Sequence, residues 1–122
     1  LEQRVEKKRY IFDFYKRELA ELEGLEFMPS NEWDEPNCWL SSIQLTGKVR
    51  PNDVMDALEE ENIESRPVWK PMHLQPFFEK YDFIGRGVSE KLFENGVCLP
   101  SDTKMTDEDL FRVVNTIKEL WI

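Results

Sequence analysis

The side chains best suited to chemistry lie closest together in residues 65–78, which read SRPVWKPMHLQPFF. This segment contains Arg66, Trp69 and the only histidine of the chain, His73. An arginine binds a carboxylate or phosphate through paired donors, a tryptophan stacks on a flat ring, and a histidine exchanges a proton near neutral pH. Prolines on both sides of Trp69 restrict the backbone, as in loops that present side chains to a ligand.

A purely structural interpretation fits the same residues. The prolines would then stiffen a connector, the aromatic side chains would fill the core, and Arg66 would pair with one of the many carboxylates. The residue types alone leave both interpretations open, so Arg66, Trp69 and His73 are candidates for substrate binding and no catalytic residue is predicted.

Other catalytic and metal-binding patterns are weak or missing. Cys38 and Cys98 lie far apart, form no C-x-x-C pair, and are expected to be small buried hydrophobic residues, with a disulfide between them as the alternative. Either cysteine with His73 would allow a nucleophilic hydrolase, but any chain with both residue types allows that. A single histidine makes a histidine-based metal site improbable, and no Walker loop, G-x-G-x-x-G or G-x-S-x-G motif is found.

Length and charge exclude several classes of protein. The chain has 122 residues, which is the size of one domain, and 40% of them are hydrophobic. The net charge of -9 disfavours nucleic acid and anionic lipid as partners. No apolar stretch is long enough to span a membrane, and the first ten residues lack the apolar core of a signal peptide, so a cytoplasmic location is expected.

Hydrophobic periodicity predicts the elements that position the candidate residues. Helices are expected over residues 1–23, from about 53 to 63, over 88–95 and over 106–122. The first helix has a wide apolar face, which predicts contact with more than one surface. The last helix begins with Thr106 and Asp109 at capping-box spacing, and Asn52 or Asp53 is available to cap the second.

Short strands are expected between these helices, over residues 25–28, 38–45 and 97–100. Residues 63–69 are expected to be extended, because each proline disfavours helix at the residue before it. The alternating order predicts an α/β (α+β two-layer) domain, in which helices flank one small three-stranded sheet. The pattern does not determine the strand directions.

Four stretches of the sequence resemble one family. They are KKRYIFDFYKREL, NCWLSSIQL, IESRPVWKPMHLQPFF and VSEKLFENGVCLPSDTKMTDEDLFRVVNTIKEL. Together they are similar to the C-terminal portion of the DegT/DnrJ/StrS family, the pyridoxal-phosphate-dependent nucleotide-sugar aminotransferases. The most specific parts are the R-P-x-W-x-P-x-H loop from Arg66 to His73 and the G-x-C-L-P-S run that begins at Gly96.

The resemblance implies that residues 1–122 are the small C-terminal domain of a fold-type I aminotransferase that works as a dimer. The family's large N-terminal domain carries the lysine that binds pyridoxal phosphate, and no lysine here matches it. No cofactor is therefore expected on this chain alone, and its implied partners are that large domain and a second subunit.

The resemblance also implies roles for the three loop residues. Arg66 would face an anionic group of the substrate, Trp69 would pack beside the sugar or base, and His73 would hydrogen-bond to it. The complete enzyme would move an amino group from glutamate to a nucleotide-linked keto-sugar, in the biosynthesis of cell-surface polysaccharide.

An alternative from another functional class is an independent acidic binding module that has the same fold and no catalysis. The first residue, Leu1, is not a methionine, which favours a truncated chain, inactive alone, over a short natural gene. The upstream DNA would separate the two, because only a truncated chain would follow a frame with a lysine-bearing domain.

Overall fold

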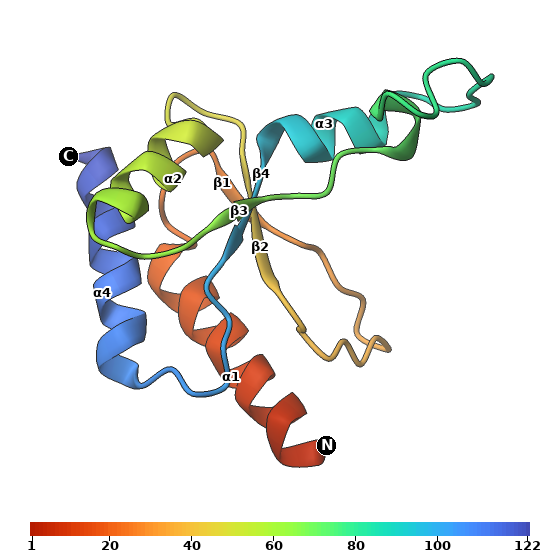
Figure 1. The fold of residues 1–122 in the computed structure, drawn as a ribbon. Helices are drawn as coiled ribbons and strands as arrows, with labels where there is room; N and C mark the ends of the chain where they lie inside the picture. The colour runs from red at the N-terminus through yellow and green to blue at the C-terminus, as the bar shows by residue number, and fades with distance from the viewer.

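A four-stranded antiparallel sheet forms the centre of the computed structural model, which describes residues 1–122 (Figure 1). Its strands are β1 (Leu25–Phe27), β2 (Ser41–Leu45), β3 (Arg66–Pro67) and β4 (Gly96–Leu99). Their order across the sheet is β1-β2-β4-β3, and every neighbouring pair is antiparallel. β4 therefore lies inside the sheet, with β2 on one side and the two-residue β3 on the other.

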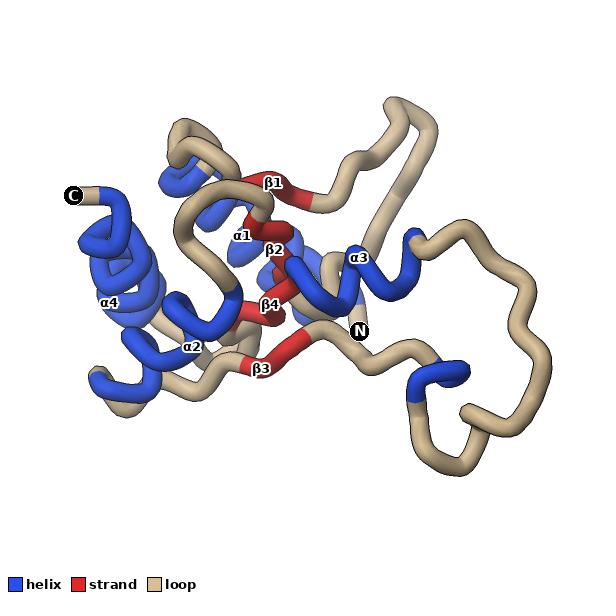
Figure 2. The backbone as a smooth tube through the Cα atoms, turned by 90° about the horizontal axis from the view of Figure 1, so that it is seen from above, coloured by secondary structure: helices blue, strands red, loops and turns tan.

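Three helices cover one face of this sheet, and one helix lies on the other side (Figure 2). The first group consists of α1 (Glu2–Leu19), α2 (Pro51–Glu60) and α4 (Asp107–Lys118). The single helix is α3 (Val88–Asn95), which touches β2 and β4. Two short 3₁₀ helices, η1 (Met72–Leu74) and η2 (Glu119–Trp121), complete the chain. Most of the second face therefore has no helix over it.

The core lies between the sheet and the three helices. Side chains alternate across the strands, so Ile43 and Val97 point toward the helices while Ser42 and Cys98 point to the second face. The core cluster has fifteen members: Ile11, Phe14, Tyr15, Leu19, Leu25, Ile43, Leu45, Val54, Leu58, Val97, Leu99, Leu110, Val113, Val114 and Ile117.

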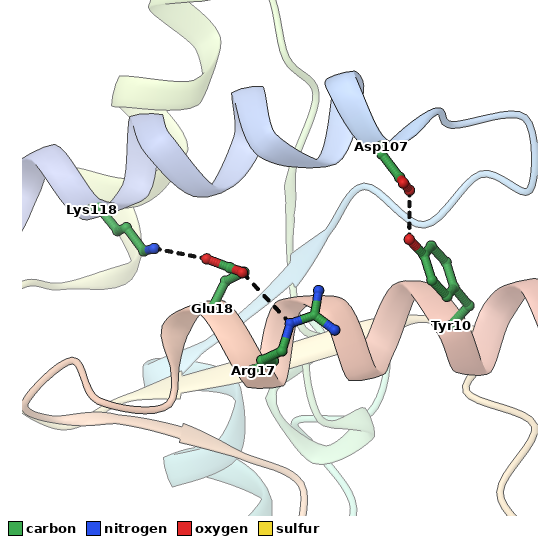
Figure 3. Close-up of polar contacts among 5 residues, drawn as sticks. All are labelled: Tyr10, Arg17, Glu18, Asp107 and Lys118. Carbon is green, nitrogen blue, oxygen red and sulfur yellow. Dashed lines mark hydrogen bonds and ion pairs between the residues drawn. The ribbon is translucent and has the colours of Figure 1, made fainter.

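Polar contacts tie α1 to α4, although the two helices lie about a hundred residues apart in sequence (Figure 3). The Tyr10 hydroxyl donates to Asp107 Oδ1 at 2.6 Å, and Lys118 Nζ donates to Glu18 Oε2 at 3.0 Å. The first bond lies near the start of α4 and the second at its end, so they fix the angle between the two helices. The predicted second contact surface of the first helix is thus α4, in addition to the sheet.

The predicted fold class is confirmed, with one added strand. β3 was expected only as extended chain, because two residues that include Pro67 carry no strand pattern. Pro67 has no N–H to donate to the sheet. It is tolerated because β3 is an edge strand, which has a neighbouring strand on one side only. The predicted strand 38–45 begins only at Ser41, since Cys38 has a φ of 50°, which is incompatible with extended chain.

Several predicted helix ends differ from the structure, since α2 ends at Glu60 and α4 ends at Lys118, where η2 follows. The first helix ends at Leu19 and continues as turns to Gly24, whose φ of 77° permits the reversal into β1. The second helix begins after Arg50, and Asp53 accepts the Arg50 N–H at 2.7 Å from its third position instead of serving as the cap. The capping box of Thr106 and Asp109 is confirmed.

No helix of the chain combines the length and the apolar character needed to cross a membrane.

Candidate functional site

Two long connections border the second face of the sheet. Residues 28–40 join β1 to β2, and residues 68–87 join β3 to α3. Both project from the body of the domain (Figure 2), and the 28–40 connection is also tied to α1, since Arg9 Nε donates to the Pro36 carbonyl at 2.8 Å. All three candidate residues belong to β3 or to the connection that follows it, because the edge strand leads directly into this projecting segment.

Arg66 lies in β3 with 77% of its side chain exposed. Its guanidinium contacts only Glu64, with Nε 2.8 Å from Glu64 Oε1. An ion pair this exposed contributes little to stability and is easily exchanged for another anion. Arg66 can therefore bind a carboxylate or phosphate without a large loss elsewhere.

Trp69 is 63% exposed and packs against a second tryptophan, Trp39, which is exposed to the same extent. The two ring centroids are 5.9 Å apart, with the planes tilted by 32°. Sequence reasoning missed Trp39, because its parity with Ile43 assigned it to the buried side of a strand. The left-handed backbone at Cys38 keeps Trp39 outside the sheet, and that conformation leaves no recognisable mark in the sequence.

His73 lies in η1, and only 17% of its side chain is exposed. Its Nε2 is 2.7 Å from Glu90 Oε1, and its ring stacks on Phe83 with centroids 3.6 Å apart and planes inclined by 11°. The pKa of Glu90 is lowered by a backbone hydrogen bond at its own residue, then by His73 and Ser89. The carboxylate is therefore ionised near neutral pH.

The structure brings two of the three candidates to one hollow. Arg66 and Trp69 line a cavity of about 700 Å³ bounded by the chain before β3, the connection from β4 to α4, and Arg112 of α4. His73 does not line this cavity, because it is turned toward α3. Joint action of all three on one ligand stays a prediction.

The interpretation of residues 65–78 as a source of core side chains is wrong. None of these residues belongs to the core cluster or packs against it. Phe77 is largely exposed, as is Trp69, and Phe78 is half-buried outside the core cluster. The pairing of Arg66 with a carboxylate, which that interpretation also expected, is present as the contact with Glu64.

The cysteines form no reactive pair and no disulfide. Both are free thiols. Cys98 is buried with Sγ 3.4 Å from the Ser42 hydroxyl, and burial raises the pKa of the half-buried Cys38. The hydrogen-bonding ring nitrogen of His73 contacts Glu90 and neither thiol, so the cysteine hydrolase alternative has no geometric support. No three His, Cys, Asp or Glu side chains lie close enough to hold a metal ion.

Solved structures first establish the class of fold. The chain superposes on an aminotransferase from Brucella abortus with a TM-score of 0.82 and 21% identity, covering 96% of this chain and 31% of that one. It superposes on the sugar aminotransferase CalS13 from Micromonospora echinospora with a TM-score of 0.82 and 22% identity, covering 96% and 31%. The domain therefore has the fold of one part of these aminotransferases.

Sequence comparison then establishes the family. Residues 1–118 match the sequence model of the DegT/DnrJ/EryC1/StrS aminotransferase family, and the chain belongs to that family. It is 42% identical to the "Putative pyridoxal phosphate-dependent aminotransferase EpsN" of Bacillus subtilis, over 99% of this chain and 32% of that protein. It is 32% identical to the GDP-perosamine synthase of Vibrio cholerae, over 93% and 32%. The chain thus spans about a third of the length of these relatives.

The residues of this chain do not fit pyridoxal phosphate by themselves. A cofactor lysine must reach into a cavity and lose its proton there. No lysine lines the 700 Å³ hollow or two other hollows of the surface. Lys70, which follows Trp69, is exposed. No step of the reaction is therefore assigned to a lysine of these 122 residues.

Proposed function

We propose that the chain is the C-terminal domain of a pyridoxal-phosphate-dependent nucleotide-sugar aminotransferase and is inactive alone. A separate large domain would carry the cofactor and its lysine. The observation that carries the proposal is the exposed pair Arg66 and Trp69 at one hollow beside the edge strand β3. Family membership and the share of the relatives' length that the chain spans support the same domain assignment.

Each exposed residue has a role that its surroundings permit. Arg66, held only by Glu64, would bind the carboxylate of glutamate or the phosphate of the nucleotide. Trp69, supported by Trp39, would pack on the sugar or base. His73 would hydrogen-bond to the same ligand. Relatives named GDP-perosamine synthase support a nucleotide-linked sugar, and with it a cytoplasmic role in making cell-surface polysaccharide.

The partners of the domain would be its own large domain and a second subunit. Bulky apolar side chains are exposed along both projecting connections and at the start of α3: Met28, Trp33, Trp39, Trp69, Met72, Phe77, Tyr81, Phe83, Ile84 and Val88. Monomeric soluble proteins rarely leave so many large apolar side chains exposed on one side. A covering partner on this side accounts for them.

Two experiments test the proposal. The 122-residue chain, mixed with pyridoxal phosphate, should give no absorption band of lysine-bound cofactor, whereas the complete enzyme should give one. In the complete enzyme, Arg66→Ala should raise KM for an anionic substrate by at least about tenfold, and Arg66→Lys should recover only part of the loss. A cofactor band in the isolated chain would refute the domain assignment, and an unchanged KM would refute the role of Arg66.

A further inference from the structure

Beyond the contact between Trp69 and Trp39, one cluster of side chains holds the 68–87 connection to the domain. His73 comes from η1, Phe83 from the end of the connection, and Glu90 from the first turn of α3. The intervening backbone bonds are all short-range turns, such as Phe78 N–H to Gln75 O at 2.8 Å. We call the cluster of His73, Phe83 and Glu90 the clasp.

The clasp fixes the ring of His73 from two directions. Phe83 stacks on its face, and Phe83 is itself held because its ring occupies the space where a side chain on Gly85 would lie. Glu90 holds the edge of the His73 ring, because its Oε1 lies 2.7 Å from His73 Nε2. The Ser89 hydroxyl donates to Glu90 Oε2 at 3.2 Å. The ring has little freedom to turn.

The ionised carboxylate determines which nitrogen carries the proton. An ionised carboxylate only accepts hydrogen bonds, so Nε2 must be the donor. A neutral imidazole has one N–H, and Nδ1 then has a free lone pair. Nδ1 forms no hydrogen bond within the chain, although the side chain is mostly buried. His73 Nδ1 is therefore a hydrogen-bond acceptor without a partner in the chain, and the clasp holds it in a fixed direction.

We propose that Glu90 and Phe83 are positioning residues that hold neutral His73 as its Nε2–H tautomer, so that Nδ1 accepts a hydrogen bond from a ligand. Resting on the proposed function, this assigns His73 to a ligand group that carries a hydrogen, such as a sugar hydroxyl or an ammonium. The anionic groups are left to Arg66. His73 and Arg66 would thus bind different groups of the substrate.

The tautomer is directly measurable, because the chain has one histidine and therefore one pair of ring nitrogen signals. The ¹⁵N-labelled chain at pH 8.5, above the ordinary imidazole pKa of about 6.5, should show a protonated Nε2 and an unprotonated Nδ1. The Nε2 proton should exchange slowly with water in the parent chain and at the rate of a free imidazole in Glu90→Ala. A protonated Nδ1, or equal exchange in both proteins, would overturn the proposal.

Trypsin provides a second readout, since Lys80 and Arg86 lie within the connection. Glu90→Ala and Phe83→Ala should each speed cleavage there by at least about fivefold, because the clasp no longer resists local opening. Glu94→Ala is the matched control, a glutamate of the same helix with no ion pair, and it should cleave at the parent rate. Glu90→Gln keeps the side-chain shape and serves if the alanine variant does not fold. Unchanged cleavage in all variants would refute the clasp.

Kinetics of the complete enzyme separate this inference from the proposed function. Glu90→Gln should raise KM for the sugar substrate more than it lowers kcat, because it disturbs an orienting contact and not the cofactor. An altered tautomer with unchanged KM would leave the clasp established and would remove His73 from substrate binding.

Discussion

At the scale of single residues, exposure separates the side chains proposed to bind a ligand from those that support the fold. Arg66 and Arg50 have the same chemistry but opposite surroundings. Arg66 contacts only exposed Glu64, whereas Arg50 donates to the Leu45 carbonyl at 2.8 Å and to Asn95 Oδ1 at 2.6 Å. Arg50 therefore joins β2 to the end of α3, and Arg66 is free for a ligand.

This contrast predicts different costs for two equivalent substitutions. Arg66→Ala should change the free energy of unfolding of the chain by no more than about 0.5 kcal/mol. Arg50→Ala should lower it by about 1–3 kcal/mol, because two partly buried acceptors lose a charged donor. Urea unfolding followed by circular dichroism measures both values. Equal losses would mean that Arg66 also has a structural role.

Gly96 is a second residue whose surroundings determine the effect of substitution. A methyl group there would overlap the Leu92 carbonyl oxygen and Val68 Cγ2, and it would lie 2.7 Å from Gln44 Nε2. Gly96→Ala should therefore lower the free energy of unfolding by about 1–3 kcal/mol through overpacking. Glu26→Ala, at an exposed position of β1, is the control and should be nearly neutral. A stable Gly96→Ala protein would show that α3 can shift away from the sheet.

At the scale of elements, local sequence signals predicted the helices closely and gave no indication that β3 pairs into the sheet. Helix α4 has both a capping box and uninterrupted helical periodicity, so local signals alone define it. β3 has no such signal, because it exists only through pairing of Arg66 with Cys98 and Pro67 with Val97. A two-residue strand is defined by its partner, which sequence periodicity does not contain.

The candidate site was predictable to the same degree. The side-chain chemistry of Arg66 and Trp69 is visible in the sequence, and so are the prolines that stiffen their loop. Trp39 and Glu90 were missed because each reaches the site across the fold, from another connection and from α3. Glu90 and Glu94 lie in the same helix, and nothing in its sequence distinguishes the one that contacts His73.

Three carboxylates at element ends predict how the free energy of unfolding depends on pH. The pKa of Glu18 is lowered mainly by the hydrogen bond from Lys118, that of Glu90 by its backbone hydrogen bond and His73, and that of Asp109 by Thr106. The unfolded chain binds protons at these groups more readily than the folded chain does. Stability should therefore be complete above about pH 5 and fall as the pH drops below it.

Melting temperatures measured from pH 7 to pH 3 check this expectation. Asp109→Asn and Glu18→Gln should each make the decline shallower, because each removes one group whose protonation favours unfolding. Glu2→Gln, at an exposed glutamate that forms no side-chain hydrogen bond or ion pair, should leave the slope unchanged. A melting temperature that does not change between pH 7 and pH 3 would show that these three carboxylates do not stabilise the fold.

At the scale of the whole molecule, the two faces of the sheet differ in kind. One face has a closed core beneath α1, α2 and α4, and the other is bordered by connections with exposed aromatic side chains. The wide apolar face of the first helix is not the source of this exposed surface, because Phe14, Tyr15 and Leu19 are buried. Most of the exposed large apolar side chains lie in the two connections.

The isolated chain should therefore associate with itself through the connections at high concentration. Sedimentation velocity should show a concentration-dependent increase in mass, which the double substitution Trp39→Ser and Trp69→Ser reduces. Ile122→Ser is the control, since it removes a fully exposed apolar side chain at the end of the chain, outside both connections. A parent chain that remains monomeric at millimolar concentration would show that these side chains do not form a docking surface.

The position of β4 has a consequence for biosynthesis. This strand joins β2 to β3, yet it begins only at Gly96, and α4, which covers α1, follows it. Until these last residues have left the ribosome, β2 lacks its central neighbour and α1 lacks its helical partner. Contacts between distant parts of a chain slow folding, because the intervening loop must be ordered first. The nascent domain thus remains open for most of its synthesis and closes only after its C-terminal helix emerges.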